Sequence, residues 1–333
     1  MDFDLNDEQK EIKRVAHELL GSRSPFPKVR EAAEASAYAP ELWSELVELG
    51  WPGIAVEAEH GGQGLGAVEL AVLLEELGYA CAASPFLSTA TAAAVIEATG
   101  STGQRERWLP ALSSGEATAG LGSAELAADA QDAAVIVLLD GDEAQLVDPA
   151  QADIKPLQTI DSTRRFASVS GSGEPLGAGA AERARLAIAA ELVGVCQRAL
   201  DMTLEYVKDR KQFGVAVGSF QAVSHRCAQM LLSTESVRSA VYFAAWAADA
   251  DPERLAEAAG LAAAAASDGG RETTASAIQA HGGIGFTWEA DVHWLFKRAQ
   301  LDAALLGGSR RHRAALAKLA AAKARGAAPA AVS

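Results

Sequence analysis

Residues 210–230 read RKQFGVAVGSFQAVSHRCAQM, a short turn that leads into a helical stretch. Arg210 carries a planar guanidinium that can donate two hydrogen bonds to one phosphate group. Phe213 is an aromatic residue that can pack against a planar group, and Gln221 lies further along the adjoining helix. Taken alone, these residues also fit a surface arginine and a core phenylalanine, so their meaning depends on the rest of the chain.

A second turn, QAHGGIG, follows at residues 279–285. Gly282 and Gly283 can adopt positive φ and allow a diphosphate to approach the main chain. Gln279 and His281 precede the two glycines in the same turn. A turn that ends a helix has the same composition, and that structural role is compatible with binding.

Long helical patterns surround both turns and predict a mainly α protein. Apolar residues recur at helical spacing in residues 182–210, 219–250 and 252–280, and a shorter pair of helices follows from residue 287. Helices of this length side by side predict a four-helix bundle. The first ~120 residues predict a separate helical lobe, whose first helix carries Asn6 as its N-cap.

The middle of the chain lacks the helical periodicity of its two flanks. Short β-type runs separated by turn residues occupy 133–139, 144–148 and 164–170. We therefore expect a reduced β-domain between the two helical regions. The predicted division is an N-terminal helical domain, a middle β-domain, a C-terminal helical bundle and a tail, at residues 1–118, 119–174, 175–325 and 326–333.

Composition limits the classes of partner. Forty-four acidic and 29 basic residues give the 333-residue chain a formal charge of −15, which argues against nucleic-acid and anionic-membrane partners. No stretch approaches the ~20 apolar residues of a membrane span, and the acidic N-terminus does not resemble a signal peptide. We expect a cytoplasmic protein. No metal site is expected, because neither the three cysteines nor the histidines show metal-ligand spacing.

Together these stretches resemble the acyl-CoA dehydrogenases, flavoenzymes with a helical N-terminal lobe, a middle β-domain and a C-terminal helical bundle. Two further matches are the opening DFDLNDEQ (2–9) and the turn ELGWPGIAVEAEHGGQGLG (48–66). The resemblance implies an acyl-CoA substrate, FAD as cofactor and an electron-transferring flavoprotein as the usual acceptor. It also implies an oligomer, because in the family the arginine motif and the 279–283 turn reach across to the flavin of the neighbouring subunit.

The catalytic base of the family has no counterpart in this chain. Acyl-CoA dehydrogenation needs a glutamate that removes the proton next to the thioester carbonyl. At the usual position, twenty-three residues after Gly283, this chain has Leu306, and at the alternative position before Arg185 it has Ala184. A hydrocarbon side chain cannot accept a proton, so no catalytic residue is predicted here.

The middle domain also departs from the family. The tract that usually holds the flavin ring and covers the thioester is absent between Gly120 and Ala133, where LGSAELAADAQD leads almost directly into the next strand. The chain therefore resembles the short, base-lacking subunit of the heterotetrameric acyl-CoA dehydrogenases of actinobacterial sterol side-chain catabolism, which work with a longer catalytic subunit. Gly307, Gly308 and Ser309 then mark the remnant of its own flavin site.

Two alternatives stay open. A self-sufficient homo-oligomeric dehydrogenase would need a displaced base, for which Glu182, Glu191 and Glu289 are the candidates. Glu191 interrupts an apolar helical run, where either a raised pKa or a buried ion pair with an arginine would explain it. A flavin-free acyl-CoA-binding scaffold is the third possibility.

Overall fold

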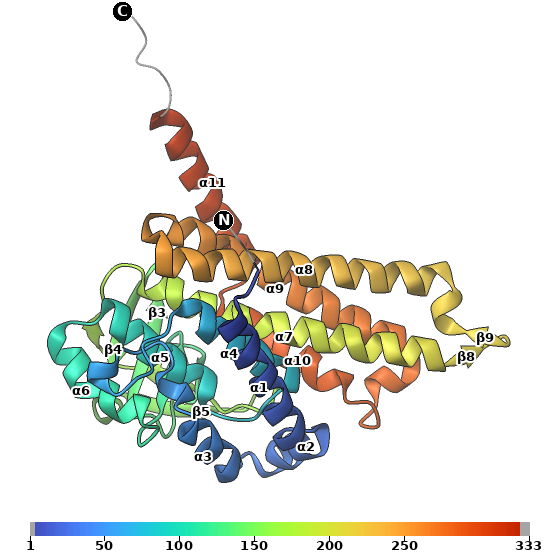
Figure 1. Cartoon of the computed structure of the whole chain (residues 1–333), viewed down its shortest axis with the longest axis horizontal. Helices are drawn as coiled ribbons and strands as arrows, with labels where there is room; N and C mark the ends of the chain where they lie inside the picture. The colour runs from blue at the N-terminus through green and yellow to red at the C-terminus, as the bar shows by residue number, and fades with distance from the viewer. Residues whose placement is uncertain (1–3, 327–333) are drawn as a thin grey trace, which may run out of the picture.

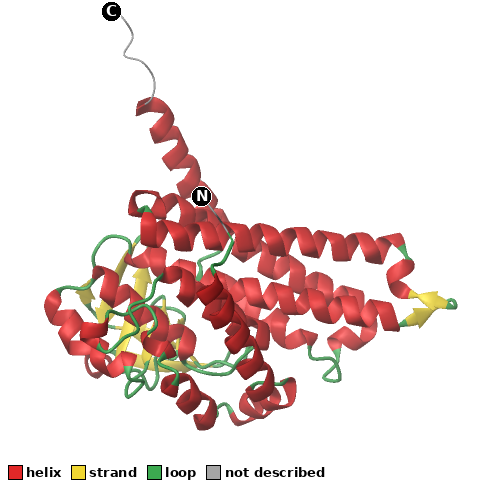
Figure 2. Cartoon of the chain, in the orientation of Figure 1, coloured by secondary structure: helices red, strands yellow, loops and turns green. Residues whose placement is uncertain are grey.

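The computed structural model describes residues 4–326, and it is mainly helical, with a seven-stranded sheet and a two-stranded hairpin. Figure 1 shows the long bundle helices extending from a more compact part that contains the sheet and the N-terminal helices, as the strands in Figure 2 also mark. The N-terminal helices are α1 (Asp7–Arg23), α2 (Phe26–Ala35), α3 (Pro40–Glu48), α4 (Ala67–Ala80), α5 (Phe86–Thr99) and α6 (Thr102–Ser113).

Local sequence signals account for the first helices. The Asn6 side chain accepts a hydrogen bond from the Gln9 backbone, and the Gln9 side chain accepts one from Asn6, so α1 begins with a capping box. Pro40 begins α3, where its missing N–H costs nothing, and Gly50 follows the helix with φ of 69°. The pattern did not predict α2, a ten-residue helix with a proline in its first turn.

The middle region forms a sheet with more strands than the sequence predicted. The three expected runs correspond to β3 (Val135–Asp140), β4 (Glu143–Val147) and β6 (Phe166–Ser170). The strands that were not expected are β1 (Ala119–Gly122), β2 (Ala127–Ala128), β5 (Asp153–Leu157) and β7 (Glu174–Pro175). The sheet order is β5-β6-β2-β1-β3-β4-β7, and only the β1–β3 pair of this sheet is parallel among the described residues.

One of these unexpected strands contains a proline. Pro156 lies within β5, which pairs only with β6 at one edge of the sheet. An edge strand tolerates proline because the missing N–H faces no neighbouring strand. The four residues of β1, AGLG, are all buried and therefore show no alternation of apolar and polar side chains.

The C-terminal region is the expected bundle. Its helices are α7 (Ala180–Asp209), α8 (Gln221–Ala250), α9 (Leu255–His281) and α10 (Val292–Leu305), and they pack side by side. A fifth helix, α11 (Ser309–Gly326), contacts α9 and then projects from the body of the protein (Figure 1).

One continuous hydrophobic core joins the N-terminal helices, the sheet and the bundle. Helices α4 and α7 approach most closely at Gly78 and Gly194, where a Cβ atom on either glycine would lie within 2.0 Å of a carbonyl oxygen of the other helix. This close packing fixes the N-terminal lobe on the bundle. No helix in residues 4–326 is both long and apolar enough to cross a membrane. The predicted domain limits stay a prediction, and the predicted tail lies outside the described residues except for Gly326.

Candidate functional site

The two glycine-rich turns meet at the far end of the bundle and form an open cavity of about 750 Å³, called the clamp cavity below. Five of the residues predicted to bind the cofactor line it, together with parts of the helices α7, α8 and α9. These five are Arg210, Phe213, His281, Gly282 and Gly283. Gln221 and Gln279 do not line the cavity, but each directly follows or precedes a residue that does.

Phe213 projects into solvent from the tip of a two-stranded hairpin, β8 (Lys211–Gln212) and β9 (Val215–Ala216). Its side chain is 93% exposed, and its backbone has φ of 54°, a conformation that a phenylalanine rarely adopts. The ring contacts Phe220 edge to face, with centroids 6.3 Å apart. Phe213 is therefore an exposed aromatic residue in a strained backbone conformation near Arg210. Both features are typical of a surface that contacts another molecule.

His281 forms part of the cavity wall and is held firmly. Its Nδ1 donates a hydrogen bond to the Ala277 carbonyl at 2.7 Å, and its ring stacks on Tyr206 with centroids 4.4 Å apart. Burial lowers the pKa of His281, so the ring is neutral near neutral pH. The adjacent Gly282 has φ of 67°, and a Cβ at Gly282 or Gly283 would meet no atom within 4 Å, so the backbone face of the turn is open.

The loop between α9 and α10 continues the exposed apolar surface. Phe286 is 79% exposed and Trp288 is 70% exposed, although both are large aromatic side chains. Lys297 places its ammonium group 4.3 Å from the centre of the Trp288 ring. Glu289 lies in the same loop, is exposed and lines the clamp cavity, so its carboxylate faces solvent at the cavity edge.

The residues predicted as the chain's own flavin remnant lie elsewhere, at the opposite end of α10. Fourteen helical residues separate the two places, which is ~21 Å at 1.5 Å per residue. Leu306 is 2% exposed, and its carbonyl accepts a hydrogen bond from His312 Nε2 at 2.7 Å. Gly307 and Gly308 both have positive φ, and their N–H groups bond to Ala304 and Ala303, so the glycine pair also ends the helix.

Neither base position carries a carboxyl group. Leu306 and Ala184 are both buried in the hydrophobic core. Glu182 lies half-buried in the first turn of α7, and its Oε2 atom is shielded from solvent without a hydrogen-bond partner in the described part of the chain. Among the three alternative bases, Glu182 is therefore the one with a solvent-shielded carboxyl oxygen that has no partner in residues 4–326.

Glu191 belongs to a buried cluster of charges, so of the two explanations offered by the sequence the structure has the buried ion pair with an arginine. It accepts hydrogen bonds from Arg164 at 2.6 Å and from Arg298 at 2.8 Å, while Arg298 also binds Asp161 at 2.8 Å. Arg164 completes the cluster by binding Asp302 at 2.8 Å. Burial opposes ionisation of Glu191, but the two guanidinium groups hold its pKa below the usual value. A carboxylate held in this way is unsuited to act as a base.

Asp302 has the opposite shift within the same cluster. Burial and the charge of Glu191 raise the pKa of Asp302 well above its usual value. Its Oδ2 atom is buried and has no partner among residues 4–326. Two guanidinium groups face three carboxyl groups here, and the charges balance when Asp302 carries a proton.

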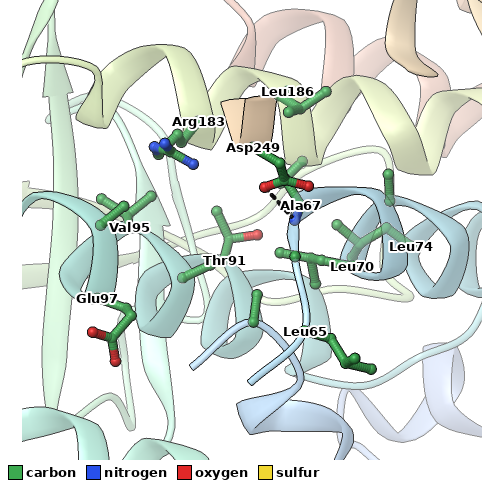
Figure 3. A pocket seen from close by; sticks show the side chains of 16 residues that line it. Leu65, Ala67, Leu70, Leu74, Thr91, Val95, Glu97, Arg183, Leu186 and Asp249 are labelled. Atoms are coloured by element: carbon green, nitrogen blue, oxygen red, sulfur yellow. Dashed lines mark hydrogen bonds between the residues drawn. The ribbon is translucent and has the colours of Figure 1, made fainter. Parts of the chain in front are cut away.

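A smaller cavity lies between α4, α5 and α7 (Figure 3). Its lining is mostly aliphatic. The Thr91 hydroxyl, which has no hydrogen-bond partner in the part of the chain that the structure describes, is among the side chains that face it in Figure 3. Asp249 lies at its edge and accepts hydrogen bonds from the backbone of Ala67 and Val68 at the start of α4. The free volume of about 90 Å³ is well below the ~300 Å³ of the smallest usual ligand pockets, so this cavity does not hold a long acyl group.

Comparison with known proteins agrees with the fold. The acyl-CoA dehydrogenase N-terminal domain matches residues 6–116, and the acyl-CoA dehydrogenase C-terminal domain matches residues 171–321. Acyl-CoA dehydrogenase IpdE2 of Mycolicibacterium smegmatis is 36% identical over 309 residues, which cover 91% of this chain and 96% of that protein. The IpdE2 protein of Mycobacterium tuberculosis is 34% identical and covers 91% of this chain and 94% of its own length.

Solved structures have the same architecture. A variant of the Tcur3481-Tcur3483 steroid ACAD is 26% identical, with a TM-score of 0.86, and the match covers 96% of this chain and 99% of that one. The ChsE4-ChsE5 complex of Mycobacterium tuberculosis has the same TM-score and the same coverages at 22% identity, which shows a shared fold. The chain belongs to the acyl-CoA dehydrogenase family, oxidoreductases that act on the CH–CH bond of acyl-CoA thioesters.

Proposed function

We propose that this chain is the non-catalytic subunit of an FAD-dependent acyl-CoA dehydrogenase, and that a longer subunit of the same family supplies the base. One observation carries the proposal: buried hydrocarbon occupies both base positions, while the clamp cavity at the other end of α10 is open and faces outward. Such a chain has the parts for binding a cofactor across an interface and lacks the part for removing a proton.

The residues of the clamp cavity fit one half of a dinucleotide. Arg210 offers a charge-assisted fork for a pyrophosphate, and Phe213 offers a ring face for an adenosine. Gly282 and Gly283 leave main-chain groups open to a phosphate, since no side chain covers them. When bound, FAD supplies the hydride acceptor for the α,β-desaturation of an acyl-CoA. The proposed cofactor lies across the subunit interface, and an electron-transferring flavoprotein is the proposed final acceptor.

Relatives support the partner and the substrate class. The Tcur3481-Tcur3483 protein is named as a pair and as a steroid ACAD, and it is 26% identical to this chain. A two-plus-two heterotetramer with a bulky, steroid-derived acyl-CoA as substrate is therefore the arrangement that we propose. Phe286 and Trp288 are exposed aromatic residues outside the lining of the clamp cavity, and we assign them as contacts to the longer subunit.

The purified chain and its complex with the longer subunit test this proposal. We expect the chain alone to hold little flavin and to show no dehydrogenation of any acyl-CoA with an artificial electron acceptor. The complex should be yellow and active. Turnover by the chain alone would overturn the proposal, and a colourless complex would favour a flavin-free scaffold instead.

Substitution of Arg210 by Gln should weaken flavin binding by the complex. Loss of a forked, charge-assisted contact costs about 1.5–3 kcal/mol, so the dissociation constant should rise by roughly 10- to 150-fold. The flavin-to-protein ratio after gel filtration measures this effect. Arg226→Gln is the matched control, because Arg226 is an exposed arginine on α8 outside the clamp cavity. Equal flavin loss in both variants would argue against the role of Arg210.

Glu182 favours the alternative of a self-sufficient enzyme, because its Oε2 atom is shielded and has no partner within the described residues. If the proposed function is right, Glu182→Gln should leave kcat of the complex unchanged within twofold. A loss of activity by about 10² or more in a complex that still holds flavin would instead identify Glu182 as a base.

A further inference from the structure

The turn between β3 and β4 accepts hydrogen bonds from two arginines that come from distant parts of the chain. Asp142 Oδ1 accepts hydrogen bonds from Arg185 Nη1 on α7 and from Arg311 Nη2 on α11, each at 3.3 Å. Arg185 also donates through Nη2 to the carbonyl of Gly141. The turn thus supplies two oxygen acceptors to the arginine pair.

The two guanidinium groups are close enough to repel each other. Burial lowers the pKa of Arg185, and the charge of Arg311 lowers it further. Arg185 is 6% exposed, so its charge is poorly solvated and needs an anionic partner. Glu182 and Asp142 are the acidic groups that oppose this repulsion. Two cations that converge on one carboxylate oxygen form a site suited to an anion with several oxygens.

This arginine pair adjoins the remnant of the chain's own flavin site. Arg311 lies in the first turn of α11, two residues after Ser309 and close to Gly307 and Gly308 in the chain. A Cβ added at Gly308 would meet no atom within 4 Å, so this backbone is open. No acidic residue lies in the first turn of α11. Apart from the contact with Asp142 and the nearby charge of Glu182, the place is therefore suited to a negative charge.

We propose that Arg185 and Arg311 form a binding site for the diphosphate of a nucleotide and that Asp142 occupies this site from within the chain. The inference rests on the proposed function, because it explains how a subunit without a base avoids loading its own site. The ligand class is a nucleotide diphosphate, and both FAD and coenzyme A contain one.

Asp142 is exposed, so a ligand can displace it from Arg185 and Arg311. Its side chain is 74% exposed, and both hydrogen bonds to Oδ1 are long, so the ion pair is weak. A diphosphate has more charge and more acceptor oxygens than one carboxylate. Asp142 therefore lowers the affinity of the site without closing it permanently.

Three variants of the full-length chain test the inference by isothermal titration calorimetry with FAD, coenzyme A and inorganic pyrophosphate. Asp142→Asn keeps the shape of the turn and removes its charge. Glu143→Gln is the matched control, since it removes one charge from the neighbouring position. The double variant Asp142→Asn with Arg311→Gln removes half of the cation pair.

We expect Asp142→Asn to bind at least one of the three probes about fivefold more tightly than the wild type, the effect of one surface ion pair. Glu143→Gln should match the wild type, and the double variant should lose the gain. A gain with FAD or with coenzyme A identifies the nucleotide. Equal binding by all proteins, no binding by any, or a gain that survives Arg311→Gln would overturn the inference. Flavin loss caused by Arg210→Gln in the complex tests the proposed function separately.

Discussion

Glu191→Gln should lower the free energy of unfolding by about 3–5 kcal/mol, the usual cost of breaking a buried ion pair by removing one partner. Glu191 accepts three hydrogen bonds from Arg164 and Arg298, and all three side chains are buried. A neutral amide leaves both guanidinium groups without their shared anion in a place that water does not reach. Urea unfolding followed by circular dichroism measures the change as a shift of the midpoint.

Asp302→Asn is the matched control from the same cluster. Burial and the charge of Glu191 raise the pKa of Asp302, which favours its neutral form, so a neutral amide of the same shape should disturb the cluster little. We expect a loss below about 1 kcal/mol. If Asp302→Asn is as costly as Glu191→Gln, then Asp302 is ionised in the folded protein and the proposed charge balance is wrong.

The two carboxyl groups also give opposite pH dependences. The folded protein binds a proton at Asp302 that the unfolded chain releases above its ordinary pKa of 3.8, so this contribution to stability declines as the pH rises above about 4. Glu191 has a lowered pKa, so its contribution is lost as the pH falls below its ordinary value of 4.5. The decline above pH 4 should be weaker in Asp302→Asn.

Gly194→Ala should be the other severe substitution, with a loss of about 3 kcal/mol or more in the free energy of unfolding. A Cβ at this position would lie 1.8 Å from the Glu75 carbonyl oxygen and 2.5 Å from the Tyr79 nitrogen, both backbone atoms of α4. Backbone cannot move aside as a flexible side chain can, so α4 and α7 would have to separate. Thermal unfolding of the purified chain measures the effect.

Gly21→Ala is the control for Gly194→Ala, because it is also a glycine within a helix. A Cβ at Gly21 would meet no atom within 4 Å. We expect a gain of about 0.5–1 kcal/mol, because alanine loses less backbone entropy on folding. Equal stability of Gly194→Ala and Gly21→Ala would mean that the close approach of α4 and α7 is absent in solution.

The sequence predicted the parts of the fold that depend on local signals. The capping box of Asn6, the proline that begins α3 and the helical periodicity of the bundle all act within a few residues. The edge strand β5 was missed because its proline is tolerated only at an edge, and strand order is a property of the whole sheet. The short helix α2 was missed because its first turn looks like a break.

The same distinction separates the predicted site residues from those that were missed. The motifs around Arg210 and Gly283 were visible because each is a short pattern, and the structure brings the two turns to one cavity. The partners of Arg164 lie 27 and 138 residues away along the chain, at Glu191 and Asp302. An arginine in the apolar helix WLFKRAQL was the available sign that Arg298 is paired in the interior.

The exposed aromatic side chains of the clamp region have a consequence for gene expression. Phe213, Phe286 and Trp288 are in water for as long as the chain has no companion. Chains produced in excess of the proposed longer subunit would associate with one another or with other proteins, because exposed apolar patches promote aggregation. Synthesis together with the proposed longer subunit would limit such association.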